Sequence, residues 1–271
     1  MPEEGLQSRR LLWDGCDNAR DVGGYPTANG GQTRRQALIR SDSLHGLTPE
    51  GQTALRDYGV RTIIDLRLAQ ELERHPNPFA ARQAPGYVPR YINLPMHDLE
   101  IDALIDASDS TQAEYIVILE RSKEHIARVI GAVAAGLAEG TVLVHCQGGK
   151  DRTAIIVALL LSLVGVSHES IAEDYALSEG LLEPRYLEWV QEQMQAHGKH
   201  PEKPRQAQTR PETMHSMLDY LDRAYGGPEG YLLAAGVGQA EIAQVREHLA
   251  SPADGGVVDH ASSRKLGRLR E

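Results

Sequence analysis

Cysteine is scarce in this sequence: only Cys16 and Cys146 occur among its 271 residues. Two cysteines cannot build the disulfide framework of a small secreted protein, so we expect a reducing compartment. Long apolar runs are also missing, because residues 1–10 carry charges without a signal-peptide core and no later run is long enough to span a bilayer. We therefore expect no integral membrane segment and a cytoplasmic protein, with export by a route that needs no signal peptide left open.

Positive charge is in short supply: 28 Lys and Arg residues stand against 38 Asp and Glu residues, giving a net charge of −10. A surface with this balance repels the phosphates of nucleic acids, so we expect no nucleic-acid partner. The hydrophobic fraction of 41% and the charged fraction of 24% are ordinary for a globular protein. At this length the chain can bury a full core, either as one large domain or as one domain with a helical extension.

Strand-like and helical patterns alternate through the first part of the chain. The strand-like segments are 36–41, Val60–Leu66, Tyr87–Leu94 and 141–145, and the helical ones are 49–59, 68–74 and a long amphipathic run over 111–138. This alternation predicts an α/β fold with a central, mainly parallel sheet flanked by helices. Open sheets of this kind bind ligands at the carboxyl ends of their strands.

The remainder of the chain is predicted to be helical. The helices cover 168–178, 183–197, 211–225 and 239–250, with no further strand, an exposed loop over 198–210 and a mobile tail over 251–271. We expect this helical part, about residues 168–250, to pack beside the sheet. There it either deepens the ligand site or simply covers the sheet.

The most informative stretch is Val142–Thr153. Its apolar start predicts a strand that stops at Cys146, Gly148 and Gly149 predict a tight turn, and a helix follows. Successive glycines let backbone N–H groups turn inward as an anion-binding nest, and the start of a helix adds further donors. A thiol at the floor of such a nest is pushed towards the thiolate. Arg152 supplies a planar fork that matches two phosphate oxygens, so the loop suits phosphoryl transfer to sulfur.

The spacing between the cysteine and the arginine is by itself a weak signal, and the surrounding residues make it strong. One alternative from the residues is a buried, inert cysteine in a tight turn between a strand and a helix. A nucleotide-binding Walker loop is disfavoured, because Lys150 is followed by Asp151 and not by the required Ser or Thr.

The segment His145-Cys146-Gln147-Gly148-Gly149-Lys150-Asp151-Arg152-Thr153 resembles the signature of the cysteine-dependent protein tyrosine phosphatase superfamily, which is His-Cys, five residues, Arg, then Ser or Thr. It is most similar to the loop of a bacterial and fungal group of tyrosine and dual-specificity phosphatases. Further segments resemble elements of the same group: Asn18–Tyr25, Leu38–Ser41, Ile63–Arg67 and Tyr225–Val237. The resemblance covers about residues 12–250, which we take as one tyrosine-phosphatase-like domain.

This resemblance implies a phosphomonoester hydrolase that acts through a phosphocysteine and needs no metal or other cofactor. Its substrates would be phosphorylated proteins, with phosphotyrosine first and phosphoserine, phosphothreonine or phosphoinositides as further candidates. Gln147 stands where a phosphoinositide phosphatase of the group carries a lysine, which leaves lipid specificity open. The alternative function is a phosphatase-like module that binds phosphorylated ligands without turnover.

The resemblance also assigns roles to individual residues. Those that would bind phosphate are Gln147, Gly148, Gly149, Lys150, Asp151 and Arg152. His145 would hold the loop through hydrogen bonds. Thr153 would either donate its hydroxyl to the sulfur or make a simple contact in the first turn of the helix. Asp65 and Arg67 would lie near the pocket at a strand end, and a buried pair that ties loops together explains them equally well. Lys150 would face either a substrate phosphate or solvent.

Phosphoryl transfer to sulfur also needs a proton for the departing oxygen, and a carboxylic acid within hydrogen-bond reach supplies it best. Asp98 follows a predicted strand end and matches the position of the proposed acid in the resembled group, so we favour it. Asp151 competes, because it lies inside the loop itself. If Asp98 is the acid, Asp151 would orient the loop or Arg152, or handle the hydrolytic water.

Overall fold

A computed structural model describes residues 9–81, 89–197 and 208–252. The central sheet has the strand order β1-β3-β6-β4-β5. Its strands are β1 (Arg20–Asp21), β3 (Leu38–Ser41), β6 (Thr141–His145), β4 (Val60–Asp65) and β5 (Arg90–Asn93). Four strands run parallel, and only β1 pairs antiparallel, with β3. The predicted mainly parallel sheet is confirmed, and the strand that leads into the cysteine loop lies at its centre.

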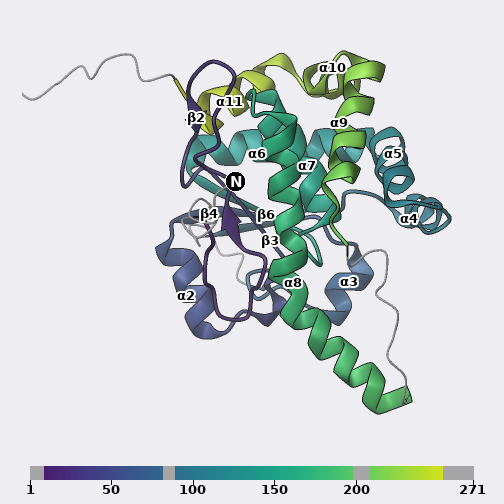
Figure 1. Ribbon diagram of the computed structural model, residues 1–271. Helices are drawn as coiled ribbons and strands as arrows, with labels where there is room; N and C mark the ends of the chain where they lie inside the picture. The colour runs from purple at the N-terminus through teal and green to yellow at the C-terminus, as the bar shows by residue number, and fades with distance from the viewer. Residues whose placement is uncertain (1–8, 82–88, 198–207, 253–271) are drawn as a thin grey trace, which may run out of the picture.

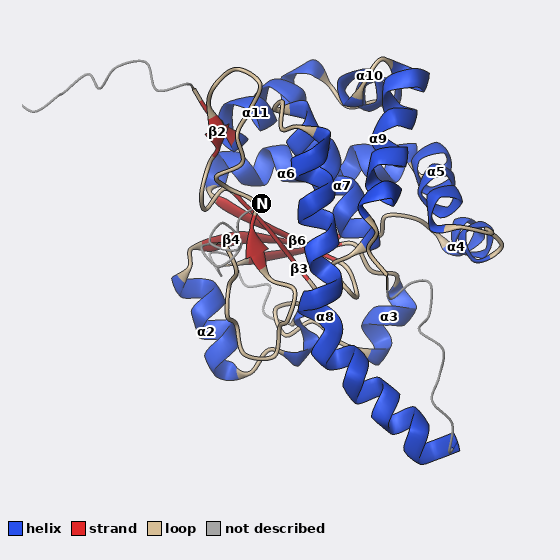
Figure 2. Cartoon of the chain, in the orientation of Figure 1, coloured by secondary structure: helices blue, strands red, loops and turns tan. Residues whose placement is uncertain are grey.

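Helices cover both faces of this sheet (Figures 1 and 2). In chain order they are α2 (Pro49–Asp57), α3 (Ala69–Arg74), α4 (Leu99–Asp106), α5 (Thr111–Arg121), α6 (Lys123–Glu139), α7 (Asp151–Leu163), α8 (His168–His197), α9 (Pro211–Tyr225), α10 (Pro228–Ala234) and α11 (Gln239–Leu249). A short 3-10 helix, Leu44–Gly46, precedes α2. No helix in the described ranges combines the length and the apolar character needed to cross a membrane.

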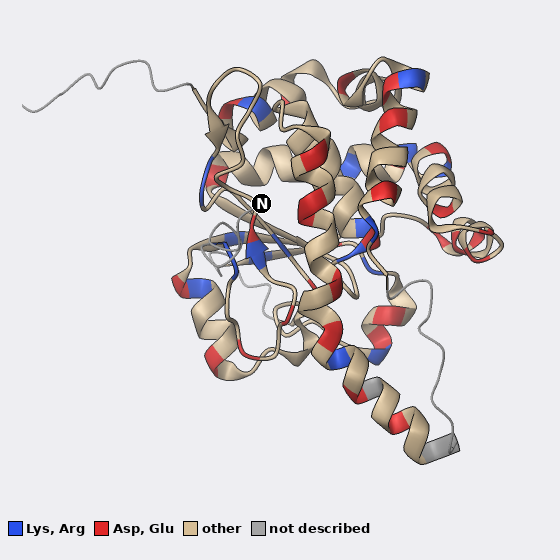
Figure 3. Cartoon of the chain, in the orientation of Figure 1, with Lys and Arg blue, Asp and Glu red and all other residues tan. Residues whose placement is uncertain are grey.

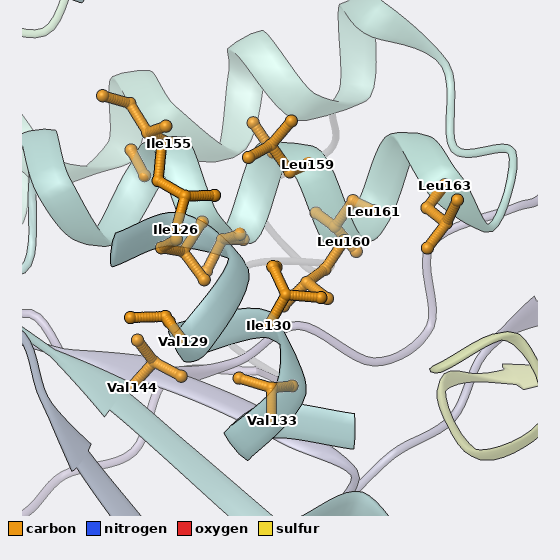
Figure 4. Close-up of a cluster of buried hydrophobic side chains, with 14 of the residues drawn as sticks. Ile126, Val129, Ile130, Val133, Val144, Ile155, Leu159, Leu160, Leu161 and Leu163 are labelled. Atoms are coloured by element: carbon orange, nitrogen blue, oxygen red, sulfur yellow. The ribbon is translucent and has the colours of Figure 1, made fainter. Parts of the chain in front are cut away.

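The core has two parts, one on each face of the sheet. On β6, Val142 and Val144 point into the larger cluster, whereas Leu143 points into the smaller cluster beside α2. The larger cluster includes residues of α6 that recur every three or four positions and lie beside the apolar residues of α7 from Ile155 onward (Figure 4): Ile126, Val129, Ile130 and Val133. Because both faces are covered, the centre of β6, residues 142–144, is an unbroken apolar run in the sequence.

The long amphipathic run over 111–138 forms two helices and not one, so that expectation is wrong. Ser122 separates α5 from α6, and it is fully buried. Its N–H donates to Ile118 O while its carbonyl accepts from Ile126 N, so the hydrogen bonding continues across a change of helix direction. Serine carries no strong breaking signal, and the apolar spacing therefore continues through the boundary.

The two helices predicted over 168–178 and 183–197 are instead one, α8, which contains Pro184. A proline inside a helix removes one hydrogen bond and usually ends or bends it. Here the first half of α8 is anchored by the buried residues Ile171, Ala172 and Tyr175. We attribute the continuity of the helix to this anchoring, which outweighs the loss of a single bond.

A small second sheet corrects the expectation that no strand follows residue 168. Its strands β2 (Gln32–Thr33) and β7 (Ala250–Ser251) pair antiparallel and tie the C-terminal helices to the N-terminal segment. Strands this short leave no periodic pattern in a sequence. The predicted exposed loop over 198–210 falls mostly outside the described residues, and so does nearly all of the predicted mobile tail.

Candidate active site

The cysteine loop connects the carboxyl end of β6 to the first turn of α7, at the centre of the sheet (Figure 1). The neighbouring strands end at the same level, because His145 pairs in register with Ser41 on one side and with Asp65 on the other. Cys146 lies at the floor of the loop and is 3% exposed. This is the position in which open parallel sheets bind ligands.

Three successive carbonyl groups of the loop are held from outside it. Gln147 O accepts from Ser43 N at 3.0 Å, Gly148 O from Asn18 Nδ2 at 2.9 Å, and Gly149 O from Arg40 Nη2 at 2.7 Å. In a trans peptide the carbonyl and the following N–H point in opposite directions, so these bonds turn the next N–H groups inward. Within the described ranges, the N–H groups of Gly148 and Gly149 donate no hydrogen bond. The loop is therefore an anion nest with open donors.

Gly149 is required by this geometry. Its φ of +64° lies in the left-handed region, and a Cβ built on it would stand 2.1 Å from Ser41 O. Gly148 differs, because the nearest atom to a Cβ there is 3.8 Å away. Of the two glycines singled out in the sequence, only Gly149 is fixed by close backbone packing.

A buried ion cluster supports the loop from behind. The carboxylate of Asp174, on α8, accepts from Arg20 Nε at 2.9 Å, from Arg40 Nη1 at 2.6 Å and from the Tyr25 hydroxyl at 2.9 Å. Arg20 in turn donates to Asn18 Oδ1 at 2.6 Å. Burial alone would raise the pKa of Asp174, but the two guanidinium groups outweigh it and hold that pKa well below its ordinary value. The cluster thus fixes both side chains that bind the loop carbonyls.

Arg152 is oriented by a residue that sequence reasoning missed. Its two terminal nitrogens donate to the carboxylate of Glu71, Nη1 to Oε2 at 2.6 Å and Nη2 to Oε1 at 2.7 Å. Glu71 also accepts from Leu68 N at 2.8 Å, at the start of α3. Burial would lower the pKa of Arg152, but the hydrogen bonds and the charge of Glu71 outweigh it and hold that pKa above its ordinary value. The only signal in the sequence is a glutamate in the first turn of a short helix.

His145, Asp65 and Arg67 form a fully buried network below the loop. His145 Nδ1 donates to Cys146 O at 3.0 Å, and its Nε2 lies 3.3 Å from Asp65 Oδ2. Arg67 Nη2 donates to the same carboxylate at 2.7 Å. Burial would raise the pKa of Asp65, but His145 and Arg67 outweigh it and lower the pKa well below its usual range. These contacts fit the reading in which the three residues hold loops in place.

Two further loop residues differ in their surroundings. Thr153 is fully buried, and its hydroxyl oxygen has no hydrogen-bond partner among the described residues. Leaving a buried polar group unpaired costs about 1–3 kcal/mol, so this hydroxyl suits a group kept for the sulfur or for a bound oxyanion. Lys150 is 5% exposed and donates from Nζ to Gln208 O at 3.2 Å. It therefore does not simply extend into solvent.

The two candidate acids lie in different places. Asp98 is exposed and caps α4 by accepting from Ile101 N at 2.9 Å, and this backbone bond holds the pKa of Asp98 below its ordinary value. Asp151, the first residue of α7, accepts from the Tyr115 hydroxyl at 2.8 Å and lines a cavity of about 420 Å³ beside the loop. Asp98 is not part of that lining.

The second cysteine has no comparable setting. Cys16 is buried, and its thiol donates to Asp42 Oδ1 at 2.8 Å. Burial and the nearby carboxylate raise the pKa of Cys16 well above its ordinary value, so this thiol stays protonated. Across the described ranges, no three His, Cys, Asp or Glu side chains are grouped so that they could hold a metal ion.

Cys146 thus lies at the floor of a loop whose carbonyl groups are held outward, and Arg152, at the end of that loop, is oriented by Glu71. The chain belongs to the tyrosine phosphatase family, whose model matches residues 11–251. It is an enzyme of the protein-tyrosine-phosphatase type, and the resemblance seen in the sequence is confirmed.

Individual relatives agree with this assignment. A tyrosine-protein phosphatase of Nostoc commune is 32% identical over 219 residues, which cover 79% of this chain and 74% of the relative. The triple specificity protein phosphatase PtpB of Mycobacterium tuberculosis is 30% identical over 280 residues, covering 86% of this chain and 96% of the relative. The crystal structure of TpbA from P. aeruginosa shows a weak likeness, with a TM-score of 0.36 and 18% identity over 78% of this chain and 96% of that one.

Proposed function

We propose that the enzyme hydrolyses phosphomonoesters of proteins through a phosphocysteine on Cys146. The thiolate attacks phosphorus, so that a phosphorus–sulfur bond forms while the ester oxygen leaves with a proton from an acid. Water then attacks the phosphocysteine, which releases inorganic phosphate and restores the thiolate. The observation that carries this proposal is the set of loop carbonyls held outward by Ser43, Asn18 and Arg40, because it leaves the amide donors facing the phosphate.

Arg152 supplies the charge that such a transfer needs. A planar guanidinium binds two equatorial oxygens of the phosphoryl group, and its bidentate pair with Glu71 fixes its plane before substrate arrives. The hydroxyl of Thr153 donates to the sulfur when the phosphocysteine breaks down, which makes the sulfur a better leaving group.

For the proton we now favour Asp151 over Asp98. Asp151 lies beside Arg152 at the edge of the loop and lines the adjoining cavity, whereas the carboxylate of Asp98 is engaged as a helix cap. Its bond from Tyr115 restricts the orientation of the carboxylate. The same residue serves as the base for the attacking water in the second step, by microscopic reversibility.

Phosphotyrosine is the proposed first substrate class, with phosphoserine and phosphothreonine as further classes. The name of the relative PtpB describes triple specificity for that enzyme, and the matched length of the two chains supports carrying a broad specificity over to this one. Phosphoinositides remain a candidate class to be tested beside the peptides.

The test is hydrolysis of an aryl phosphate by the purified protein in the presence of a metal chelator. We expect turnover by the wild type and its loss in Cys146→Ser, which keeps the size of the side chain but removes the thiolate. Turnover that requires a divalent metal, or that survives in Cys146→Ser, contradicts the proposal. Tight binding of phosphopeptides without any turnover would support the non-catalytic module instead.

A further inference from the structure

A cavity of about 420 Å³ opens directly beside the phosphate loop. Its walls come from α3, α4, α5 and the first turn of α7, and they include Asp151 and Arg152. A substrate whose phosphate lies in the loop therefore has its neighbouring groups at the mouth of this cavity. We call this space the flanking pocket. Its volume falls within the range of about 300–1,000 Å³ that is typical of small-ligand sites.

Negative charge dominates the walls of the flanking pocket. Five carboxylates line it: Glu71, Asp102, Asp106, Glu114 and Asp151. Two guanidinium groups of the lining oppose them, of which that of Arg152 is paired with Glu71, and the ammonium group of Lys150 lies 3.4 Å from Asp151 Oδ2. Figure 3 shows the acidic residues of α4 on this part of the molecule. The unbalanced charge is therefore negative, next to a loop built to bind an anion.

A buried histidine adds a neutral acceptor to this lining. His97 is 4% exposed, and its Nδ1 lies 3.3 Å from Asp98 O, which can only accept, so Nδ1 carries the hydrogen. Burial and the nearby charge of Arg152 lower the pKa of His97, which favours the neutral ring. Its Nε2 is then an acceptor, and within the described residues it has no hydrogen bond, although His97 lines the cavity.

The remaining surface of the pocket is apolar. Leu68, Leu99, Ile105 and Ile118 line it between the polar groups. An apolar wall that ends in carboxylates and a free acceptor matches a long aliphatic stem with a cationic, donor-rich tip. Lysine and arginine side chains have this form.

We propose that the flanking pocket binds the lysine or arginine side chain of a residue next to the phosphorylated residue in a protein substrate. This inference rests on the proposed phosphatase function and adds a substrate preference to it. Polyphosphorylated inositol lipids are disfavoured by the same charges, because their further phosphates would meet carboxylates at the mouth of the loop.

The test compares two phosphotyrosine peptides that differ only in carrying Arg or Glu on both sides of the phosphotyrosine. For the wild type we expect kcat/KM to be roughly tenfold higher for the basic peptide, since partly exposed ion pairs are each worth about 0.2–1 kcal/mol. In Asp102→Asn/Asp106→Asn this ratio falls to about threefold or less, since two of the ion pairs are lost. A soluble phosphoinositide is measured beside the peptides, and we expect a kcat/KM below that of the basic peptide.

Glu100→Gln is the matched control, because Glu100 also lies in the first turn of α4 but does not line the pocket. The Glu100→Gln variant should keep the full preference for the basic peptide over the acidic one. Phenyl phosphate, which has no group to reach the pocket, reports the phosphatase activity itself, so loss of that activity is distinguishable from loss of preference. The same peptides are also titrated onto Cys146→Ser, where the basic one should bind roughly tenfold more tightly even without turnover.

Equal kcat/KM values for the two peptides overturn the proposal. A preference for the basic peptide that persists undiminished in Asp102→Asn/Asp106→Asn also overturns it. The same holds if Glu100→Gln reduces the preference as strongly as the double variant does, since the cause would then be the general surface charge. A phosphoinositide hydrolysed faster than the basic peptide would assign the pocket to lipid headgroups and overturn it as well.

Discussion

Replacing Gly149 by alanine tests the carbonyl-out geometry of the phosphate loop. The new Cβ would stand 2.1 Å from Ser41 O, and a backbone oxygen cannot move aside as a flexible side chain can. In addition, the left-handed φ of +64° costs an L-residue about 1–2 kcal/mol. The loop must therefore shift away from β3. A displacement on the order of 1 Å at reacting groups lowers rates by about 10²-fold, and we expect a loss of this size in kcat.

Gly148→Ala is the matched control, because the same methyl group there meets its nearest atom only at 3.8 Å. We expect its kcat to stay within roughly threefold of the wild type, since no close contact forces the loop to move. Each kcal/mol of strain lowers Tm by about 2–4 °C in a protein of this size, so Gly149→Ala should also melt several degrees earlier. Turnover of an aryl phosphate and thermal melting of both variants are the assays. Equal activities of the two variants, or an unimpaired Gly149→Ala, would refute the reasoning.

Three further predictions concern the charges around the loop. Glu71→Gln weakens the bond that fixes Arg152 and should lower kcat about tenfold, since charge-assisted hydrogen bonds contribute roughly 1.5–3 kcal/mol. Glu73→Gln, on the same helix, should leave kcat unchanged. Equal losses of kcat for the two variants in steady-state assays would contradict this prediction. Asp174→Asn leaves two buried guanidinium groups without their partner and should cost about 3–5 kcal/mol in urea unfolding at neutral pH. The pKa of Asp174 in the folded protein lies below the ordinary 3.8, so its contribution to the free energy of unfolding is present above that pH and is lost as the pH falls further. The variant should therefore lose less stability in acid than the wild type. An identical dependence of stability on pH in the two proteins would argue against the cluster. Asp151→Asn should lower kcat for phenyl phosphate about 10²-fold and abolish the fall of kcat at high pH, whereas Asp98→Asn should keep that pH dependence. The opposite result would return the acid role to Asp98.

The cysteine loop is the part of the site that sequence reasoning locates best. Its chemistry is local: an apolar strand, a cysteine, two glycines and an arginine follow one another within a dozen residues. Local propensity and hydrogen bonding also fix the ends of β6 and the start of α7, so the predicted strand over 141–145 and the helix after the loop agree with the structure. The same holds for α2, which begins at Pro49 as predicted and is capped by Thr48.

The supporting residues could not be assigned in this way. Asn18 and Arg40 enter the sequence argument only as members of resembling segments, because their partners in the loop are more than one hundred residues away. Asp174 lies on a helix where an acidic residue would ordinarily face solvent, and nothing local indicates that it is buried between two arginines. Such pairs depend on tertiary packing, which periodicity does not report.

The choice between the two candidate acids depended on tertiary structure for a different reason. Asp98 follows the end of a strand-like segment, a position that in the sequence suits either an acid at the site or a helix cap. In the structure α4 begins immediately after Asp98, and Asp98 caps that helix. Helix boundaries are the least predictable feature of a sequence, so the two roles could not be separated beforehand.

The central claim is that Cys146 becomes covalently phosphorylated during turnover, and rapid chemical quench tests it most directly. An aryl phosphate with a good leaving group makes formation of the phosphocysteine faster than its hydrolysis, so the intermediate accumulates in the first turnover. Mass spectrometry of the quenched, digested protein should then find one phosphoryl group on the peptide that contains Cys146, and none in Cys146→Ser. Turnover without protein-bound phosphate, or phosphate bound to another residue, would contradict the account.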